Sequence, residues 1–369
     1  MTQPTIPLVD LSSQQEQINN LIREGFNRVI AESSFIMGPQ VEEFEEAWAA
    51  YCGVPFSMGL GNGTDAIEIA LRAAGVGRGH EVIIPANTFV ATAGAVKRSG
   101  AVPVLADCNE NFLLDPAEVA LKVTKRTKAV IGVHLYGQAA PMEAIRNAVP
   151  HSVTIVEDMA QAQGARRHGV RAGALGDVAA TSFYPGKNLG AYGDAGAVMS
   201  ASKPIASRVR KLRNHGGNAR YEHLEVGFNS RLDTLQAVVL NAKLNFLDEW
   251  NGQRVRAAER YDQLLADLQM VKLPRVAADN EHVFHLYVVR VPDRDRVVRE
   301  LNAVGIGAGI HYPRPIHLLP AYSHLGHRRG DFPTAERHAA EIMSLPLYPG
   351  ITAQQQEQVA SALGKVLGR

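Results

Sequence analysis

The sequence predicts an α/β protein, with a mostly parallel central sheet flanked by helices and a smaller α+β unit at the C-terminal end. Between about residues 53 and 200, short apolar runs alternate with helical patterns, and the pattern changes after Pro274. Apolar strands that alternate with helices are typical of a parallel sheet buried on both faces. The 369 residues exceed one typical domain. We therefore expect a large domain over residues 1–250 and a small domain over 251–369, with the first ~30 residues packing on the small domain.

The expected elements follow from hydrophobic periodicity. The strand candidates are Glu81–Pro85, Val102–Ala106, Ala129–Val133, Val153–Val156, Val178–Phe183 and Ala195–Met199. The helix candidates between them are Thr64–Ala74, Phe89–Ser99, Pro116–Val123 and Pro141–Ala148. Residues 231–265 then predict one long helix, since Leu235, Val238, Val239, Ala242 and Phe246 recur at helical spacing. In the C-terminal unit we expect a strand at Val283–Val291 and helices near 293–304, 334–343 and 352–367.

The overall charge and the cysteine content exclude several function classes. With 38 basic and 37 acidic residues, the net charge of +1 gives no global field that would attract nucleic acid or an anionic membrane. The two cysteines, Cys52 and Cys108, form neither a zinc spacing nor a disulfide framework. The N-terminus lacks the features of a signal peptide, and no apolar run is long enough to cross a bilayer. These features predict a cytoplasmic protein.

A glycine-rich turn precedes the first predicted helix of the large domain. The segment Gly59-Leu60-Gly61-Asn62-Gly63-Thr64-Asp65 allows close backbone approach, and the N-terminus of the helix offers unpaired N–H groups to an anion. It is not a Walker A loop, but Gly61, Gly63 and Ala66 fit a loose dinucleotide fingerprint. An ordinary turn with an Asn/Thr/Asp helix cap explains the same residues. The turn alone therefore leaves an anion site, a dinucleotide site and a cap open.

Two further motifs follow predicted strands. Glu157 and Asp158 directly follow the strand candidate Val153–Val156. An acid at the end of a strand can pair with a cationic ligand group or cap the next segment. Lys187 lies in Ser182-Phe183-Tyr184-Pro185-Gly186-Lys187-Asn188-Leu189-Gly190, after the next strand. A partly desolvated lysine has a lowered pKa and can act as nucleophile or base, whereas most lysines are simply solvated.

Together the three motifs match the needs of pyridoxal 5′-phosphate (PLP). Its phosphate requires N–H and hydroxyl donors, its pyridine nitrogen requires a carboxylate, and its aldehyde requires a lysine amine for a Schiff base. Ligands of parallel sheets bind at the carboxyl ends of the strands, where all three motifs are expected. The combination therefore predicts a PLP site with the cofactor on Lys187.

The chain resembles the DegT/DnrJ/EryC1/StrS sugar aminotransferases, a family of fold-type-I PLP enzymes. The resemblance runs from Phe35-Ile36-Met37-Gly38-Pro39 to Leu345-Pro346-Leu347-Tyr348-Pro349. Between these ends it is carried by Asn62-Gly63-Thr64-Asp65-Ala66, Glu157-Asp158-Met159-Ala160-Gln161-Ala162, the Lys187 loop and Gly227-Phe228-Asn229-Ser230-Arg231-Leu232-Asp233. Two positions depart from the family pattern: Ala195 replaces a glycine near the cofactor loop, and Pro141 replaces an aspartate at a helix start.

The resemblance implies a role for each matching residue. Lys187 would hold the cofactor and then move the proton between the substrate carbon and the cofactor. Asp158 would pair with the pyridinium nitrogen, and Gln161 would lie near the phenolic oxygen of the ring. Phe89 would stack on the ring. The remaining cofactor contacts would come from Gly63, Thr64 and Ser182 at the phosphate, and from Asn229 at the phosphate of a neighbouring subunit, which makes a homodimer with shared active sites the minimal active unit.

The resemblance also implies the substrates, L-glutamate as amino donor and a keto-sugar nucleotide as acceptor. The segments Tyr184–Asp194 and His311–His317 resemble the group that aminates C3 of dTDP-3-keto-6-deoxyhexoses, whereas C4-aminating members usually have a histidine before the lysine. The candidates for lining the sugar pocket are Tyr184, His215, Tyr221, His311 and His317. The histidines do not converge in a metal-binding context, and we predict no metal site. The basic stretch 208–213 reads as a solvated helix face.

Three alternatives remain beside the C3 aminotransferase. A C4-aminating relative would use the same cofactor site. An NAD-dependent sugar dehydrogenase or epimerase would need a strand before the glycine turn and an acid at the end of the next strand, which here ends at Pro85-Ala86-Asn87. A PLP-binding regulator without turnover would have a similar pocket. Sugar dehydratases of the family replace the lysine with histidine, and the presence of Lys187 speaks against that activity.

Overall fold

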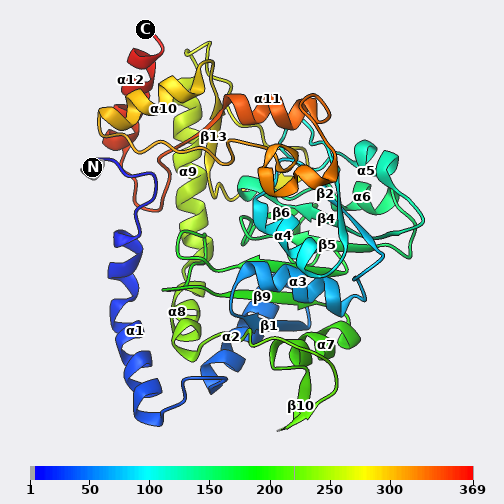
Figure 1. The fold of residues 1–369 in the computed structure, drawn as a ribbon. Coiled ribbons are helices and arrows are strands. Elements are labelled where there is room, and N and C mark those ends of the chain that lie inside the picture. Colours follow the sequence, from blue (N-terminus) through cyan, green and yellow to red (C-terminus); the bar gives the residue numbers. More distant parts are fainter. Residues whose placement is uncertain (1–4, 220, 369) are drawn as a thin grey trace.

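A seven-stranded sheet forms the centre of the protein (Figure 1). The computed structural model describes residues 5–219 and 221–368. The strands lie in the order β1-β9-β8-β5-β4-β2-β3. Their bounds are β1 Phe56–Leu60, β2 Glu81–Pro85, β3 Val102–Ala106, β4 Thr127–Val133, β5 Thr154–Asp158, β8 Val178–Ser182 and β9 Gly196–Ser200. Only β9 among them pairs antiparallel with its neighbours, β1 and β8, so the predicted mostly parallel sheet is confirmed.

Both faces of the sheet are buried, which explains the continuous apolar runs of its strands. Ile84 and Ile131 enter the core on one face, and their chain neighbours Ile83 and Val130 enter the core on the other. The covering helices are α2 Pro39–Cys52, α3 Gly63–Ala73, α4 Val90–Arg98, α5 Pro116–Lys122, α6 Met142–Asn147, α7 Lys203–Arg213 and α8 Thr234–Leu244. The sheet therefore presents its strand ends, rather than its faces, to ligands.

The C-terminal unit has its own apolar core. Its strands β13 (Tyr287–Arg290) and β14 (Ile342–Leu345) pair antiparallel, beside α9 (Leu247–Leu265) and the helices α10 (Arg294–Ala303) and α12 (Ala353–Val366). Ile6 is buried in the same core, so the N-terminal segment joins the small unit, whereas α1 (Ser12–Glu32) packs against α8 (Figure 1). A domain boundary near residue 250 remains our proposal, and it falls within α9.

Short elements complete the chain. They are the helical turns η1 Leu135–Gly137, η2 Ile316–Leu318 and η3 Pro320–Leu325, the helix α11 Pro333–Glu341, and the strands β6 Arg166–Arg167, β7 Val170–Arg171, β10 Gly217–Ala219, β11 Glu222–His223 and β12 Asn280–Glu281. The carboxylate of Asp107, after β3, accepts hydrogen bonds from the amides of Thr334 and Ala335 at the start of α11, each 2.9 Å long. This cap ties the small unit to the sheet.

Three sequence predictions need correction. The long helix expected over 231–265 is two helices, because the chain turns at Asn245–Phe246. The helix α8 is buried on most sides, whereas α9 buries one face and exposes the other to solvent. One straight helix could not meet both conditions. The strand expected at Val283–Val291 begins only at Tyr287, since the amides of Val283 and Leu286 donate to η1 instead. The helix expected over 334–343 ends at Glu341, where β14 follows.

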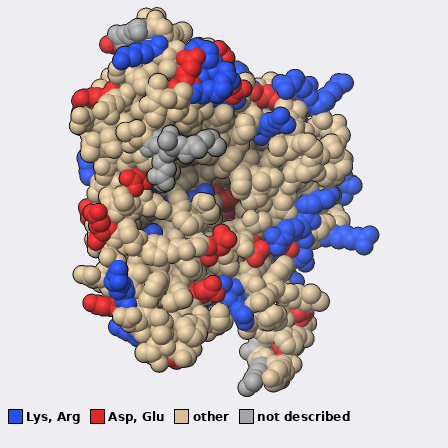
Figure 2. Space-filling view, turned by 60° about the vertical axis from the view of Figure 1, so that its left-hand side comes forward, with Lys and Arg blue, Asp and Glu red and all other residues tan. Residues whose placement is uncertain are grey.

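The surface has no single dominant charge on the face drawn in Figure 2, where basic and acidic side chains are interspersed. This distribution agrees with the nearly balanced sequence charge. Among the described residues, no helix is long and apolar enough to cross a membrane.

An aromatic cluster supports the loop that follows β8. Phe183, at the end of that strand, meets Trp48 and Phe44 of α2 edge-on, with ring centroids 5.5 and 5.3 Å apart. All three side chains are fully buried, and the Trp48 indole donates to the sulfur of Met199 at 3.3 Å. The cluster fixes the strand end from which the Lys187 loop starts.

We expect Trp48→Ala to lower the free energy of unfolding by about 3–5 kcal/mol, because it leaves a large cavity beneath Phe183. Urea denaturation measures this loss. Glu46→Ala, two residues away on the exposed face of α2, serves as the control and should change the free energy by about 0.5 kcal/mol at most. Equal effects of the two variants would contradict the supporting role of the cluster.

Candidate active site

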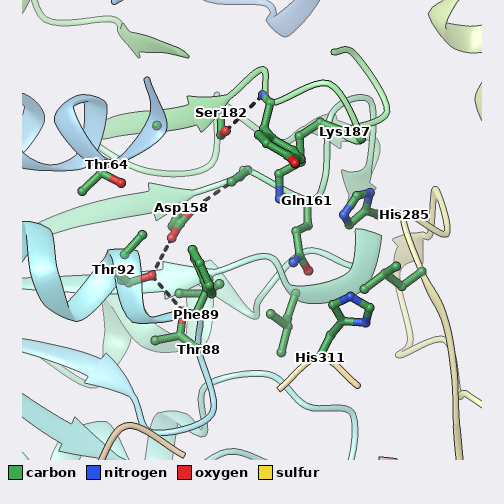
Figure 3. Close-up of a pocket in the computed structure, with 18 of the residues that line it drawn as sticks. Thr64, Thr88, Phe89, Thr92, Asp158, Gln161, Ser182, Lys187, His285 and His311 are labelled. Carbon is green, nitrogen blue, oxygen red and sulfur yellow. Dashed lines mark hydrogen bonds between the residues drawn. The ribbon is translucent and has the colours of Figure 1, made fainter. Parts of the chain in front are cut away.

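A cavity of about 430 Å³ opens at the carboxyl ends of β1, β5 and β8 (Figure 3). Three groups of residues line it: the glycine turn before α3, the segment Thr88–Thr92 that begins α4, and the loop after β8. The small unit contributes His285, His311 and Tyr312 from the opposite side. Nine of the predicted site residues meet here: Gly63, Thr64, Phe89, Asp158, Gln161, Ser182, Tyr184, Lys187 and His311.

Strand alternation separates the two acids at the end of β5. Asp158 faces the cavity, where its Oδ2 accepts from Thr92 Oγ1 at 2.8 Å and its Oδ1 accepts from the amide of Ala160 at 3.2 Å. Glu157 points to the other side of the sheet and is fully buried. Its carboxylate accepts from the amides of Gly173, Leu175 and Gly176 and pairs with His134 Nε2 at 2.9 Å. Asp158 is thus the acid available to a ligand.

Burial raises the pKa of Asp158, while the hydrogen bonds from Thr92 and Ala160 and the charge of Lys187 counteract this effect. Thr92 is itself held by Thr88, with 2.8 Å between the hydroxyl oxygens. The carboxylate is therefore fixed in position yet lacks a full counter-charge. A cationic ligand group would supply that charge.

The Lys187 side chain reaches into the cavity from a turn after β8, on the same side as Asp158 (Figure 3). Its amide donates to the carbonyl of Tyr184 at 2.8 Å, and the amide of Ala191 donates to Phe183 at 2.8 Å, which closes the loop. Burial lowers the pKa of Lys187 to about 8, against the opposing charge of Asp158. Within the described chain, the Lys187 amine makes no hydrogen bond to protein. It is thus available as nucleophile or base at neutral pH.

Two side chains behind the loop hold it in place. Gln163 accepts from the amide of Leu189 at 3.3 Å and donates to the carbonyl of Ser182 at 2.7 Å. Lys243 of α8 is buried and donates to the carbonyl of Gly190 at 2.7 Å. These contacts fix the chain on both sides of Lys187.

The N-terminus of α3 forms a cradle beside Ser182. Asn62 caps the helix by accepting from the amide of Asp65 at 2.8 Å, which leaves the first-turn amides of Gly63 and Thr64 without helical partners. A Cβ at Gly63 would lie 2.5 Å from the Cβ of Ser182, so only glycine allows this approach. The amides, together with the hydroxyls of Thr64 and Ser182, form an anion-binding arrangement.

Gln161 connects the two units across the cavity. Its Oε1 accepts from the amide of Tyr136 at 2.7 Å, and its Nε2 donates to the hydroxyl of Tyr312 at 3.1 Å. The ring of Tyr312 lies 4.9 Å from that of Phe89, whose side chain is 47% exposed toward open space. His311 Nδ1 lies 2.8 Å from Ser344 Oγ, and burial lowers the pKa of His311 to about 4, so its ring is neutral.

Four predicted residues lie outside the cavity of this single chain. His317 is buried, with its Nε2 2.9 Å from Glu336 and its ring against that of Phe332. These contacts stabilise the fold and leave His317 out of reach of a ligand in the cavity. His215 and Tyr221 are exposed around the β10–β11 hairpin, and Asn229 is exposed where its backbone bridges to Asn214. The structure does not bring these four to Lys187.

Sequence reasoning did not single out several lining residues. Thr88 and Thr92 flank Phe89 in the sequence, and Tyr312 follows His311. Their hydroxyl groups, next to predicted site residues, are the signal that could have identified them. His285 had no signal in the sequence beyond its residue type. Leu8 and Val9 come from the N-terminal segment.

The donor set fits PLP at each of its three functional groups. The cradle offers N–H and hydroxyl donors to a phosphate, Asp158 offers a carboxylate to the pyridine nitrogen, and Lys187 offers an amine to the aldehyde. Among the described residues, no group of three or more His, Cys, Asp or Glu side chains is placed to hold a metal ion.

The geometry argues against a dinucleotide site at the glycine turn. A strand, β1, does precede the turn, but its neighbour in the sheet is the antiparallel β9. The next strand along the chain, β2, ends at Pro85 and is followed by Ala86 and Asn87, without an acid for the ribose.

Comparisons with known proteins show the family of the chain. A model of the DegT/DnrJ/EryC1/StrS aminotransferase family matches residues 16–364. The chain is 44% identical to a pleiotropic regulatory protein of Geobacillus stearothermophilus, over 98% of each chain. It is 43% identical to dTDP-3-amino-3,4,6-trideoxy-alpha-D-glucose transaminase of Streptomyces venezuelae, over 98% of this chain and 96% of the relative. It is 40% identical to UDP-N-acetyl-3-dehydro-alpha-D-glucosamine 3-aminotransferase of Acidithiobacillus ferrooxidans, over the full length of both.

Solved structures show the same fold. The crystal structure of S. venezuelae DesV in complex with a ketimine intermediate superposes with a TM-score of 0.96, at 42% identity over all of both chains. The structure of ntda from Bacillus subtilis with bound cofactor PMP has a TM-score of 0.88, at 32% identity over 96% of this chain and 82% of that one.

We expect the Lys187 amine of the cofactor-free protein to titrate with a midpoint near pH 8, because burial disfavours its charged form. Brief acetylation at a series of pH values, with each lysine quantified by mass spectrometry, gives this midpoint. An exposed lysine such as Lys365 provides the internal reference, and a common midpoint for both residues would contradict the desolvation of Lys187.

Proposed function

Because this chain belongs to the DegT/DnrJ/EryC1/StrS aminotransferase family, we propose that it transfers an amino group from L-glutamate to C3 of a dTDP-3-keto-6-deoxyhexose. The family membership makes it a PLP-dependent transaminase that acts on sugar nucleotides. The observation that carries the proposal is the placement of the Lys187 amine and the Asp158 carboxylate at one cavity, beside the cradle of α3.

When bound, PLP supplies an electron sink for the carbon next to the transferred nitrogen. The residues of this chain would hold and orient it. Gly63, Thr64 and Ser182 would donate to its phosphate, and Phe89 would pack on its ring. Asp158 would stay ionised beside the pyridine nitrogen and keep that nitrogen protonated, since a cation opposite the carboxylate offsets the cost of burial.

Lys187 both anchors the cofactor and moves the proton. Its lowered pKa leaves a substantial neutral fraction at pH 7 to 8, so Nζ could move a proton between the substrate carbon and the cofactor. The loop contacts of Gln163 and Lys243 keep Nζ within reach of both positions. The neutral rings of His311 and Tyr312 close the cavity on the sugar side.

The lining of the cavity favours an uncharged sugar ring. Lys187 is the only lysine or arginine among the described lining residues, and it is committed to the cofactor. A uronic acid would bring a carboxylate to a wall without a counter-charge, whereas a 6-deoxyhexose brings a methyl group and hydroxyls. The dTDP-sugar transaminase of S. venezuelae and the Tyr184–Asp194 motif support the same substrate.

A second copy of the chain would complete the site. Among the described lining residues there is no further cation for the carboxylates of glutamate. Asn229, His215 and Tyr221 are exposed and do not line the cavity of their own Lys187. Phe35, Ile36 and Met37 are between 44% and 50% exposed, which is typical of a surface that another chain covers. We propose a homodimer in which Asn229 reaches the phosphate in the partner's cavity and His215 and Tyr221 approach its sugar.

We expect Lys187→Ala to abolish transamination, because the substitution removes the amine that would hold the cofactor and take the proton at the substrate carbon. Borohydride should fix the cofactor to Lys187 in the wild-type protein, and peptide mapping should locate it there. Lys365→Ala, at an exposed lysine, is the control and should retain the borohydride adduct. Turnover by Lys187→Ala at the wild-type rate would refute the role of Lys187.

The acceptor is tested with a panel of dTDP- and UDP-linked 3-keto and 4-keto sugars in the presence of glutamate. We expect the highest kcat/KM for a dTDP-3-keto-6-deoxyhexose, and NMR should place the new C–N bond at C3. Amination at C4 would favour the C4-aminating alternative, and a protein that binds PLP but aminates no sugar would favour the regulator.

The shared site is tested by mixing two impaired variants, Lys187→Ala and Asn229→Ala, under conditions that exchange subunits. A mixed dimer contains one cavity with both native residues, so up to about a quarter of the wild-type activity should return if dimers form at random. Two copies of the same variant provide the control. No recovery, despite subunit exchange, would place Asn229 in its own subunit's site or outside any site.

A further inference from the structure

His285 is a buried side chain that lines the active-site cavity from the small unit, on the side of Lys187 (Figure 3). Its Nδ1 lies 3.0 Å from Oδ1 of Asn188, the residue that follows Lys187. The contact joins residues 97 positions apart in the sequence. The loop of Lys187 and the imidazole of His285 are therefore held as one unit.

A chain of amides fixes which nitrogen of His285 carries the proton. Asn251 donates through Nδ2 to the carbonyl of Gln163 at 2.9 Å, so its Oδ1 is an acceptor. Asn188 donates through Nδ2 to that oxygen at 2.8 Å and to the carbonyl of Val283 at 3.2 Å. Two backbone carbonyls, which can only accept, thus orient both amides. Oδ1 of Asn188 must accept as well, and His285 Nδ1 must be the donor.

The remaining nitrogen, Nε2, is consequently a bare acceptor at the wall of the cavity. Burial and the nearby charges of Lys187 and Arg254 hold the pKa of His285 well below its ordinary value, so the ring does not take up a second proton. Among the described residues, Nε2 has no hydrogen-bond partner, and the Lys187 amine has none either. An acceptor and an ammonium donor, neither of them bonded to a described protein group, therefore line the same cavity.

We propose that His285 is a positioning residue for Lys187: the two groups do not bond in the structure, and a rotation of the lysine side chain brings its amine to Nε2, to which it donates a hydrogen bond once it is free of the cofactor. This contact would keep Nζ inside the cavity, between Asp158 and the small unit, and ready to move a proton. The inference deepens the proposed function, since it concerns the same lysine, but it rests on the hydrogen-bond chain and not on turnover.

Other charged or titratable groups face this pair and must be considered in any pH profile. Asp158 of β5 opposes the lowering of the Lys187 pKa, and Arg254 of α9 donates to the carbonyl of His285 at 3.4 Å. His311 lies on the same wall of the cavity as His285 and is neutral, and burial raises the pKa of Tyr312 above its ordinary value. None of these groups changes in the variants below.

Two substitutions distinguish the roles of the two ring nitrogens of His285. His285→Asn keeps a donor for Asn188 at the place of Nδ1 and removes the acceptor at Nε2. His285→Gln can present its Oε1 where Nε2 was. His282→Asn is the matched control. The imidazole of His282 is half-buried, lies three positions earlier in the sequence and does not line the cavity.

The readout is the acetylation midpoint of Lys187 in the full-length protein without cofactor, which does not depend on the proposed reaction. Loss of a hydrogen bond to the ammonium should lower the midpoint by about one pH unit in His285→Asn. His285→Gln and His282→Asn should stay within about 0.3 unit of the wild type. An unchanged midpoint in His285→Asn, or equal shifts in His285→Asn and His285→Gln, would overturn the proposal.

Side-chain ¹⁵N NMR of the wild-type protein provides a test that needs no substitution of His285. We expect Nδ1 to carry the proton and Nε2 to be unprotonated at pH 7, and the Nε2 resonance should move in Lys187→Ala. A protonated Nε2, or a resonance that ignores Lys187→Ala, would overturn the assignment. The failure of borohydride to fix PLP on Lys187 would instead refute the proposed function and leave this result standing.

Discussion

The carboxylate of Asp158 is the constraint around which the rest of the site is arranged. It is buried at the end of a central strand, where an ionised carboxylate is costly unless hydrogen bonds and a nearby cation compensate. Thr92 and Ala160 supply the hydrogen bonds, and Lys187 supplies part of the charge. A protonated pyridine ring would supply the rest. The site is therefore most favourable electrostatically when a cofactor of the PLP type lies between the acid and the lysine.

The same strand presents one acid, Asp158, to the cavity and uses the other, Glu157, for structure. The carboxylate of Glu157 accepts hydrogen bonds from three backbone amides and pairs with His134, all on the face of the sheet away from the cavity. It cannot turn toward a ligand without leaving those donors unpaired. The Lys187 loop is held with similar completeness by Gln163, Asn188 and Lys243. The reactive groups are thus few, and their surroundings leave them little freedom to move.

Much of the fold could be predicted because its strands are buried on both faces and read as apolar runs. The strand β1 escaped prediction, since Phe56-Ser57-Met58-Gly59-Leu60 contains serine and glycine that pack closely rather than a continuous apolar run. The break at Asn245–Phe246 was also missed, because apolar residues continue at helical spacing across it. These failures have one cause: tertiary packing overrides the local pattern.

The site was predictable where neighbouring residues share a motif, as for Gly63, Asp158 and Lys187. The contact of Asn188 with His285 joins segments far apart in the sequence, and no local pattern announces it. His317 illustrates the reverse, because its motif also contains His311, yet its side chain is buried outside the cavity, where it bonds to Glu336 of α11. The roles assigned to the individual site residues, and the dimer, remain predictions.

A crystal structure of the protein with PLP would show directly whether Asp158 and Lys187 hold the cofactor between them. We expect continuous electron density from Lys187 to the cofactor, with the pyridine nitrogen within ~3 Å of an Asp158 carboxylate oxygen. The phosphate should lie against the amides of Gly63 and Thr64. Density for PLP on another lysine, or a pyridine nitrogen that faces away from Asp158, would contradict the account.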